Sequence, residues 1–286
     1  MDYNLCDRQT VERLLKKHGF TFSKAMGQNF LIDGSVCPAM AAALHADETT
    51  GVLEIGPGIG VLTKELCRVA GKVTAVELDK RLFPLLAETL GDYPQLSLVE
   101  GDILHLDLPA LLTEHFDGCS RIKVCANLPY YITSPVIMTL LESHLPVDEL
   151  VVMVQKEAAE RLCAPVGTRE AGAVSVAVQY YGESEILFEV GRESFLPAPK
   201  VDSAVIRIRL RQEPLFPLDS EKQFFTFVKA AFSQRRKTLV NSVSGTLHLP
   251  KDEVLAALAA LSLPAGIRAE QLTMEDFAGL YNALQR

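Results

Sequence analysis

The 286-residue chain lacks several features that would assign it to a broad class of proteins. No apolar run reaches the roughly 18 residues that a membrane-spanning helix needs. Asp2, Asp7 and Glu12 fall in the first twenty residues, which contain no apolar core segment, so a secretory or transit peptide is not expected. The six cysteines form no C-x-x-C pair and the histidines no H-x-x-x-H pair, which argues against a zinc site and a disulfide framework. We therefore expect a cytoplasmic protein without a structural metal and without a membrane partner.

Charge is distributed unevenly along the chain, although its net value is only −8. Residues 38–191 hold 10 basic side chains against 22 acidic ones, whereas residues 192–237 hold 10 against 5. A basic stretch after an acidic body permits local contact with a polyanion. A solvated charged face explains the same distribution, so charge alone does not establish a nucleic-acid partner.

Strand-like and helix-like patterns alternate from residue 52 to residue 156, which is typical of a buried parallel sheet. The next segments, 173–181 and 185–190, are predicted to form a hairpin through Gly182-Glu183-Ser184, with a further strand at 203–210, so the sheet should end antiparallel. Helical patterns follow the Pro-rich passage at 214–217, which places a domain boundary there and predicts domains of 1–212 and 213–286. The earlier strands are predicted at 52–55, 72–76, 96–100, 122–126 and 150–155; the helices at 60–70, 80–90, 135–144, 221–234, 237–243, 251–261 and 274–284.

A glycine-rich turn follows the first predicted strand. Glu54 precedes Gly56, Gly58 and Gly60, and a helix should begin directly afterwards. Glycines between a strand and a helix let a ligand approach the backbone closely. The dinucleotide fingerprint needs a third glycine where this chain has Val61, so the match to it is incomplete. Taken alone, the turn fits a purely structural role equally well.

Acidic residues at the ends of the next two strands make a ligand site the better interpretation. Glu77 ends the second strand and can accept both hydroxyls of a ribose, while Asp102 follows the third and can accept from an adenine amino group. A pyrophosphate would be repelled by carboxylates at Glu54 and Glu77, whereas a sulfonium cation with an ammonium group would not. The pattern therefore favours S-adenosylmethionine over NAD.

The fourth predicted strand ends in Asn127-Leu128-Pro129-Tyr130, the most specific motif of the chain. The Asn127 side-chain oxygen and the Leu128 carbonyl can accept both hydrogens of an adenine amine and draw its nitrogen toward tetrahedral geometry. Pro129 restricts φ and holds that carbonyl rigid. Tyr130 offers a ring on which a base can stack. These residues predict methyl transfer to an adenine amine, driven mainly by alignment.

With these motifs the chain resembles the ribosomal RNA adenine N6-dimethyltransferases, in particular the branch that acts on two adjacent adenosines near the 3′ end of small-subunit ribosomal RNA. The resemblance implies a Rossmann-like S-adenosylmethionine methyltransferase fold, with a mostly parallel seven-stranded sheet that ends antiparallel, plus a small C-terminal all-helical domain. This chain departs from the family at two places. The N-terminal extension is long and basic in the family but not here, and Val240 stands where relatives often carry a basic residue. The matching segments are 24–33, 54–60, Glu77, Asp102, 127–130, 195–203 and 232–239.

The resemblance also assigns roles to individual residues. Phe195 would sandwich the target base opposite Tyr130, since a base that leaves its stack needs an aromatic face on each side. Gln28, Asn29 and Leu31 would close over the methionine end of the cofactor, Glu77 would hold its ribose, and Asp102 and Ile103 its adenine. Leu78 is also expected to bind the cofactor. The RNA contacts would come from Lys200, Lys229, Arg235, Arg236 and Lys237, although the last four also fit a solvated helix end.

The expected activity is methyl transfer from S-adenosylmethionine to N6 of two neighbouring adenosines, within the immature small ribosomal subunit and by a monomer. One alternative is the relative that methylates large-subunit RNA and confers macrolide resistance, against which the longer helical C-terminus speaks. Another is a chiefly non-catalytic assembly factor for the small subunit. An NAD-dependent oxidoreductase is disfavoured by Val61 and by the lack of a hydride-transfer acid.

Overall fold

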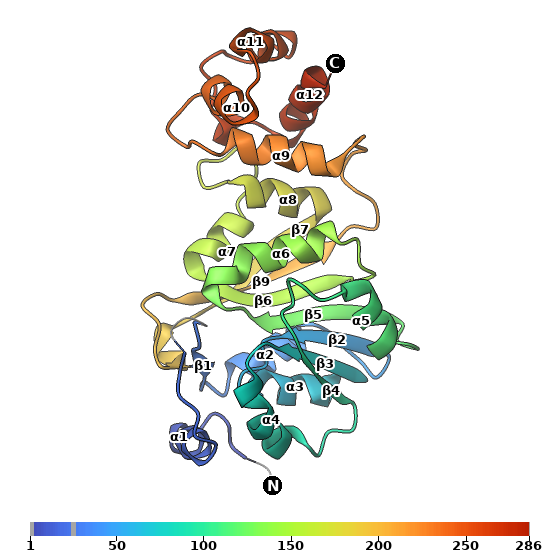
Figure 1. Cartoon of the computed structure of the whole chain (residues 1–286), viewed down its shortest axis with the longest axis vertical. Helices are drawn as coiled ribbons and strands as arrows, with labels where there is room; N and C mark the ends of the chain where they lie inside the picture. Colours follow the sequence, from blue (N-terminus) through green and yellow to red (C-terminus); the bar gives the residue numbers. More distant parts are fainter. Residues whose placement is uncertain (1–2, 24–26, 286) are drawn as a thin grey trace. The chain divides into compact units, whose positions relative to one another are not determined.

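The computed structural model describes residues 3–23 and 27–285 (Figure 1). Its contacts divide the chain into two compact units, one of Met1–Ala159 with Glu185–Leu210 and one of Glu160–Ser184 with Arg211–Arg286. Residues 160–184 thus group with the C-terminal helices. The domain limits expected from the sequence, 1–212 and 213–286, stay a prediction.

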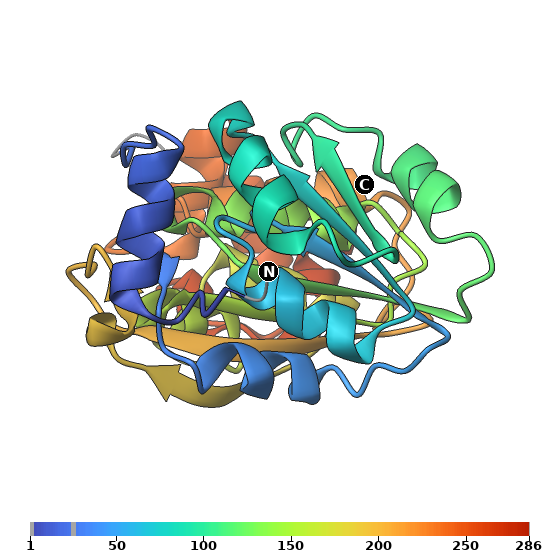
Figure 2. The same cartoon turned by 90° about the horizontal axis from the view of Figure 1, so that it is seen from below.

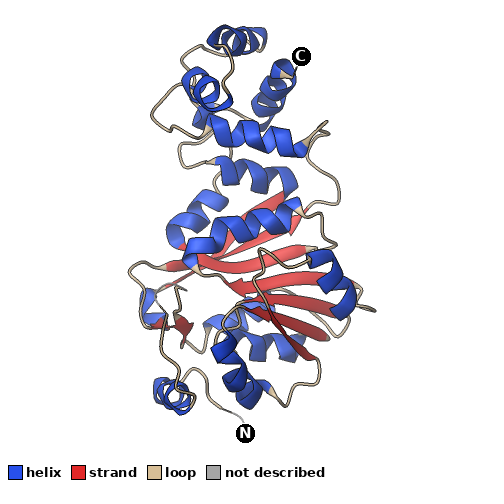
Figure 3. Cartoon of the chain, viewed as in Figure 1, coloured by secondary structure: helices blue, strands red, loops and turns tan. Residues whose placement is uncertain are grey.

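The first unit is built on a seven-stranded sheet in the order β4-β3-β2-β5-β6-β9-β7 (Figure 3). Strands β2 to β6 pair in parallel, and β9 pairs with β6 in antiparallel register, with Ser203 opposite Gln155. This confirms the predicted fold class. The strands are β1 (Phe30–Leu31), β2 (Thr50–Ile55), β3 (Lys72–Glu77), β4 (Leu96–Glu100), β5 (Arg121–Asn127), β6 (Glu149–Gln155), β7 (Gly182–Val190), β8 (Phe195–Leu196) and β9 (Ser203–Leu210).

Helices cover both faces of this sheet, which explains why its central strands are apolar along their whole length. Every residue of β2 is buried. Helix α2 packs against α3 and β6, and Figure 2 shows α2 and α3 side by side. Figure 1 shows α5 and α6 on the opposite face. The helices of this unit are α1 (Arg8–Lys17), α2 (Val36–Ala43), α3 (Val61–Val69), α4 (Phe83–Leu90), α5 (Leu108–His115), α6 (Thr133–Glu142) and the start of α7 (Lys156–Leu162).

The second unit is helical and has an aromatic core. Tyr180 and Phe224 are fully buried, with ring centroids 6.0 Å apart, and the Tyr281 ring lies 5.6 Å from Phe224. The hydroxyl of Tyr181 donates to the carboxylate of Glu221, 2.7 Å away, in the first turn of α9. The helices are α8 (Ala173–Tyr181), α9 (Glu221–Ala231), α10 (Leu239–Leu247), α11 (Lys251–Ala260) and α12 (Met274–Leu284).

The predicted hairpin at 173–190 is wrong in its first half. Residues 173–181 form helix α8, and the predicted turn at 182–184 is the beginning of β7. The physical reason is that α8 is buried around most of its circumference, so its sequence lacks the polar stripe that identifies a surface helix. Its buried residues are Ser175, Val176, Ala177, Val178, Tyr180 and Tyr181.

Candidate active site

One cavity lies where the carboxyl ends of β2, β3, β4 and β5 meet the N-terminal segment 27–31. It brings together all the residues predicted for methyl transfer and all but one of those predicted for the cofactor. The predicted residues that line it are Gln28, Asn29, Leu31, Glu54, Gly56, Gly58, Glu77, Leu78, Asp102, Ile103, Asn127, Leu128, Pro129, Tyr130 and Phe195. Gly60 is absent from this lining.

The glycine turn has the left-handed backbone that its composition predicts. Gly56, Gly58 and Gly60 have φ values of 69°, 59° and 90°, a region in which side chains are strained. A Cβ on Gly60 would lie 2.7 Å from a methyl carbon of Leu90. Gly60 therefore lets the start of α3 pack closely against α4, while Gly56 and Gly58 border the cavity. A contact between Gly60 and the cofactor stays a prediction.

Glu77 ends β3 and is fixed by the backbone around it. Its carboxylate accepts from the Asp79 N–H at 2.8 Å and from the Gly58 N–H at 3.3 Å. Burial is the largest influence on its pKa and raises it, while these backbone hydrogen bonds oppose the rise. A carboxylate held in this way keeps further acceptor positions for a pair of hydroxyls at the cavity wall.

Glu54 lies in β2 and is only 1% exposed. Its Oε2 atom makes no hydrogen bond to any described residue, although the carboxyl borders the cavity. Burial raises the pKa of Glu54 to about 8, a rise that the nearby Thr63 hydroxyl opposes and the Glu77 carboxylate reinforces. A buried acceptor without a partner is costly. A bound cation with N–H donors would remove this cost.

Asp102 and Leu78 lie at the rim of the cavity. The Asp102 carboxylate accepts from the Leu104 N–H at 3.0 Å, and its other oxygen lies 3.0 Å from Nδ1 of His105. Leu78 is 47% exposed. Ile103 is buried beside Asp102. Together they form an apolar surface with one acceptor, as an adenine ring requires.

The segment 27–31 is tied to the end of β3 by a residue that sequence reasoning missed. Asp79 is 3% exposed, and its carboxylate accepts from the Gln28 amide nitrogen at 2.8 Å. Arg81 donates two hydrogen bonds to the same carboxylate, which lowers the pKa of Asp79 to about 2. No motif marks Asp79, because an acid followed by two bases looks like a solvated turn. Residues 24–26, the first three of the resembling segment 24–33, lie outside the described residues.

The Asn127–Tyr130 motif forms the edge of the cavity at the end of β5. Leu128 donates its N–H to the Met153 carbonyl at 3.1 Å, and Pro129 has φ −57°. Asn127 lines the cavity at this edge, next to Leu128. The Tyr130 hydroxyl lies 2.8 Å from the Ser203 hydroxyl. Burial raises the pKa of the Tyr130 phenol, which therefore stays neutral.

Phe195 reaches the cavity through a short two-stranded ribbon. β8 pairs with β1 so that Leu31 is opposite Phe195 and Phe30 is opposite Leu196. The N-terminal segment is thus joined to the segment that carries Phe195. The Phe195 side chain is 3% exposed and borders the cavity from within the apolar core. Its stacking against a base stays a prediction.

The predicted RNA-contacting residues are all exposed, and all of them except Lys229 lie outside a helix. Helix α9 ends at Ala231, so 235–237 belong to the loop before α10 and not to the helix that carries Lys229. The guanidinium of Arg235 donates to the Arg169 carbonyl at 3.1 Å, which joins this loop to the loop before α8. Lys200 lies in the first unit.

The cavity lining fits S-adenosylmethionine better than a phosphate-bearing cofactor. Among the described residues, its lining contains three carboxyl groups, on Glu54, Glu77 and Asp102, and no Lys or Arg. A pyrophosphate needs cationic or N–H donors, whereas a sulfonium and an ammonium group are attracted by carboxylates. Elsewhere, the part of the chain that the structure describes contains no metal-binding group of His, Cys, Asp or Glu and no helix able to cross a membrane.

Comparison with known proteins gives consistent matches over nearly the whole chain. A family described as ribosomal RNA adenine dimethylase matches residues 19–286. The ribosomal RNA small subunit methyltransferase A of Geobacillus sp. (strain WCH70) is 43% identical over 288 residues, covering 100% of this chain and 99% of that protein. The protein of the same name from Staphylococcus epidermidis is 44% identical over 285 residues, covering 98% and 96%.

Two solved structures are similar in fold and sequence. A dimethyladenosine transferase from Plasmodium falciparum has a TM-score of 0.72 and 29% identity, covering 88% of this chain and 95% of its own. The 23S rRNA methyltransferase ErmE has a TM-score of 0.67 and 28% identity, covering 90% and 100%.

Proposed function

Because the chain belongs to the ribosomal RNA adenine dimethylase family, we propose that it transfers methyl groups from S-adenosylmethionine to N6 of two adjacent adenosines in the 3′-terminal hairpin of small-subunit ribosomal RNA. The product is N6-dimethyladenosine at both positions. The observation that carries this proposal is the single cavity that Asn127 to Tyr130 share with the carboxyl groups of Glu54 and Glu77.

The cofactor supplies an electrophilic methyl carbon bonded to a positively charged sulfur. Glu77, fixed by the N–H groups of Gly58 and Asp79, would hold the ribose hydroxyls. The unpartnered oxygen of Glu54 would attract the ammonium group. Segment 27–31, held by Asp79, would close over the methionine end and exclude water.

The residues of the Asn127 motif orient the adenine amine. The Asn127 side-chain oxygen and the Leu128 carbonyl accept its two N–H groups, which turns the nitrogen lone pair toward the methyl carbon. Tyr130, anchored through Ser203, stacks on the base. The methylated ammonium product is acidic enough to release its proton without a dedicated base. Catalysis is then chiefly a matter of orientation, which can contribute several orders of magnitude.

Two methyl transfers to one nitrogen require that the contacts tolerate the loss of one N–H. After the first transfer one hydrogen remains, so one of the two acceptors is enough to hold the amine. The exocyclic C–N bond can present the remaining hydrogen to Asn127 or to Leu128. The same geometry therefore serves both methylations.

The small-subunit substrate is favoured over the large-subunit one by the relatives. Those more than 40% identical over nearly the full chain carry small-subunit names, whereas the large-subunit enzyme is 28% identical. The experiment compares both substrates directly. The enzyme is incubated with methyl-labelled S-adenosylmethionine and either small or large subunits that lack the modification, and the labelled bases are mapped.

Label at two neighbouring adenosines of the small subunit is the expected result. Label in large-subunit RNA would reassign the substrate. Binding to the small subunit without any label would leave only the assembly role. The matched variant for that comparison is Glu77→Ala, which should lose methyl transfer while it still binds the subunit.

A further inference from the structure

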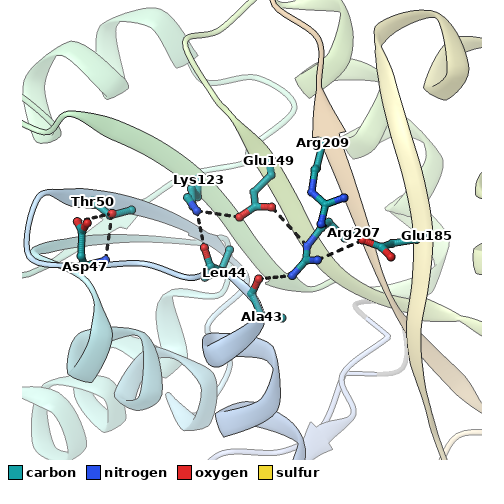
Figure 4. A network of polar contacts seen from close by, with 9 residues as sticks. All are labelled: Ala43, Leu44, Asp47, Thr50, Lys123, Glu149, Glu185, Arg207 and Arg209. Carbon is teal, nitrogen blue, oxygen red and sulfur yellow. Dashed lines mark hydrogen bonds and ion pairs between the residues drawn. The ribbon is translucent and has the colours of Figure 1, made fainter.

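Three buried charged residues on the sheet lie outside the proposed chemistry. Lys123 on β5, Glu149 on β6 and Arg207 on β9 are 5%, 7% and 7% exposed. Figure 4 shows their side chains pointing toward one another across these strands. Lys123 Nζ lies 2.8 Å from a Glu149 oxygen, and Arg207 Nε lies 3.4 Å from the other oxygen. Buried ion pairs are weak contributors to stability compared with apolar packing, so their presence requires another explanation.

Both cations of this group also contact the end of helix α2. Lys123 donates to the Leu44 carbonyl and Arg207 to the Ala43 carbonyl (Figure 4). These carbonyls belong to the last residue of the helix and to its C-cap. Helix C-termini carry partial negative charge and unpaired carbonyls, which cations stabilise. The last turn of α2 itself contains no basic residue, so the sheet supplies the charge that the helix lacks.

Helix α2 also forms part of the cavity wall. Cys37 and Met40, three residues apart on one face of the helix, line the cavity. Helix α2 has only eight residues, and its N-cap Ser35 makes no side-chain capping bond. A helix this short has little stability of its own. Its position therefore depends on its packing against α3 and β6 and on the two cations at its C-terminus.

We propose that Lys123 and Arg207 are positioning residues for the cofactor site. By fixing the C-terminal carbonyls of α2, they set the register of Cys37 and Met40 against the cavity. Glu149 pairs with both Lys123 and Arg207, and Glu185 lies 3.1 Å from Arg207 and holds that side chain as well. This inference rests on the proposed function, because it assumes that the cavity binds S-adenosylmethionine.

Arg209 offers a matched control on the same strand. Its guanidinium lies 3.1 Å from the same Glu185 carboxylate, but its side chain is 56% exposed and donates to neither α2 carbonyl. Arg207→Met and Arg209→Met therefore remove the same charge from β9, and only the first releases α2. Three properties are measured for both variants: equilibrium binding of S-adenosylmethionine, the Michaelis constants for the cofactor and for small subunits, and hydrogen exchange of the backbone amides of residues 36–44.

Arg207→Met is expected to weaken cofactor binding by roughly 3- to 30-fold, a range typical of residues that act through a packed element. The Michaelis constant for the subunit should stay within about twofold, and the α2 amides should exchange faster. Arg209→Met should match the wild type in all three measurements.

A single substitution leaves Glu149 buried beside fewer partners and can unfold the protein. The combined variant Lys123→Met, Glu149→Leu, Arg207→Met avoids this, because apolar replacement of a complete buried ion group is often neutral or stabilising. It should melt near the wild-type temperature and still bind the cofactor more weakly. If it folds and binds S-adenosylmethionine as the wild type does, the positioning role is wrong. If the wild type itself does not bind S-adenosylmethionine, the proposed function fails instead.

Discussion

The hydroxyl of Tyr130, in the motif that ends β5, lies 2.8 Å from the hydroxyl of Ser203, the first residue of β9. The two residues come from segments that are far apart in the sequence, and β6 separates their strands in the sheet. The contact holds the hydroxyl end of the Tyr130 side chain in place. A ring fixed before the base arrives loses less conformational entropy on binding.

Substitutions at Tyr130 should separate anchoring from stacking. Tyr130→Phe keeps the ring and loses one hydrogen bond, worth about 0.5–1.5 kcal/mol, so kcat/KM for the subunit should fall by no more than about tenfold. Tyr130→Ala also loses stacking of about 1–3 kcal/mol, so its kcat/KM for the subunit should fall further. Ser203→Ala serves as the control and should resemble Tyr130→Phe. Equal losses for the phenylalanine and alanine variants would show that the ring does not carry the base contact.

The buried Glu54 should make the stability of the cofactor-free protein depend on pH. Its pKa is about 8 in the folded protein and 4.5 as the ordinary value, so between these values the folded state binds more protons than the unfolded one. The free energy of unfolding should therefore fall as pH rises through this window, by at most about 1.4 kcal/mol per pH unit from this group. Below the window and above it, Glu54 adds no slope. Urea unfolding of the wild type and Glu54→Gln measures the difference, and parallel pH profiles for the two would contradict it.

Cofactor binding should show the opposite dependence on pH. An ammonium group favours the ionised form of Glu54, so affinity should rise with pH up to about 8, where the group ionises unaided. Glu54→Gln should bind more weakly and without this dependence. Calorimetric titration with S-adenosylmethionine in buffers of different ionisation enthalpy also counts the proton released, and a value of zero at about pH 7 would argue against the role.

A substitution at Asp79 should affect binding of the cofactor more than binding of the RNA. Asp79→Asn weakens the link between Gln28 and Arg81, which should loosen segment 27–31 and raise the dissociation constant for S-adenosylmethionine several-fold, as is common for residues that orient a binding group. The neighbouring pair of Lys80 and Glu100 is exposed, so Glu100→Gln is a control with little expected effect. The same fluorescence or calorimetric titration serves both variants. Equal affinities for Asp79→Asn and Glu100→Gln would remove Asp79 from the site.

Much of the site could be predicted from the sequence because it consists of local motifs at strand ends. Glu54 and Glu77 lie at the carboxyl ends of two recognisable strands and Asp102 follows a third, and parallel strands bring such ends to one edge. Asp79 was missed because the sequence shows only an acidic residue before two basic ones, and its contact with Gln28, 51 residues away, depends on the fold.

Features that depend on tertiary contacts could not be predicted in the same way. β1 and β8 have two residues each, too few for any periodicity, and they exist only because Leu31 meets Phe195. Helix α8 was predicted as a strand because it is buried on most sides. Helices α1, α2, α5 and α7 were not predicted; α2 is short and apolar, so its sequence has no polar face to mark it.

The loop 235–237 should contribute to RNA binding through phosphate contacts. Its three basic side chains are exposed, and the loop belongs to the second unit. Replacing Arg235, Arg236 and Lys237 by alanine should reduce the slope of log affinity against log salt by about 2 to 3, because each phosphate contact contributes slightly less than one. Lys222→Ala, on an exposed position of the first turn of α9, should change it little. A slope unchanged in the triple variant would leave these residues as a solvated loop.

The most direct measurement is mass-spectrometric mapping of small-subunit RNA after reaction with wild-type protein and with Asn127→Ala, each with its S-adenosylmethionine affinity measured in parallel. The wild type should dimethylate two adjacent adenosines. Asn127→Ala should leave them unmodified at cofactor concentrations that saturate it, since it lacks the side-chain acceptor for the amine. Two dimethylated adenosines from Asn127→Ala at the wild-type rate would contradict the assignment.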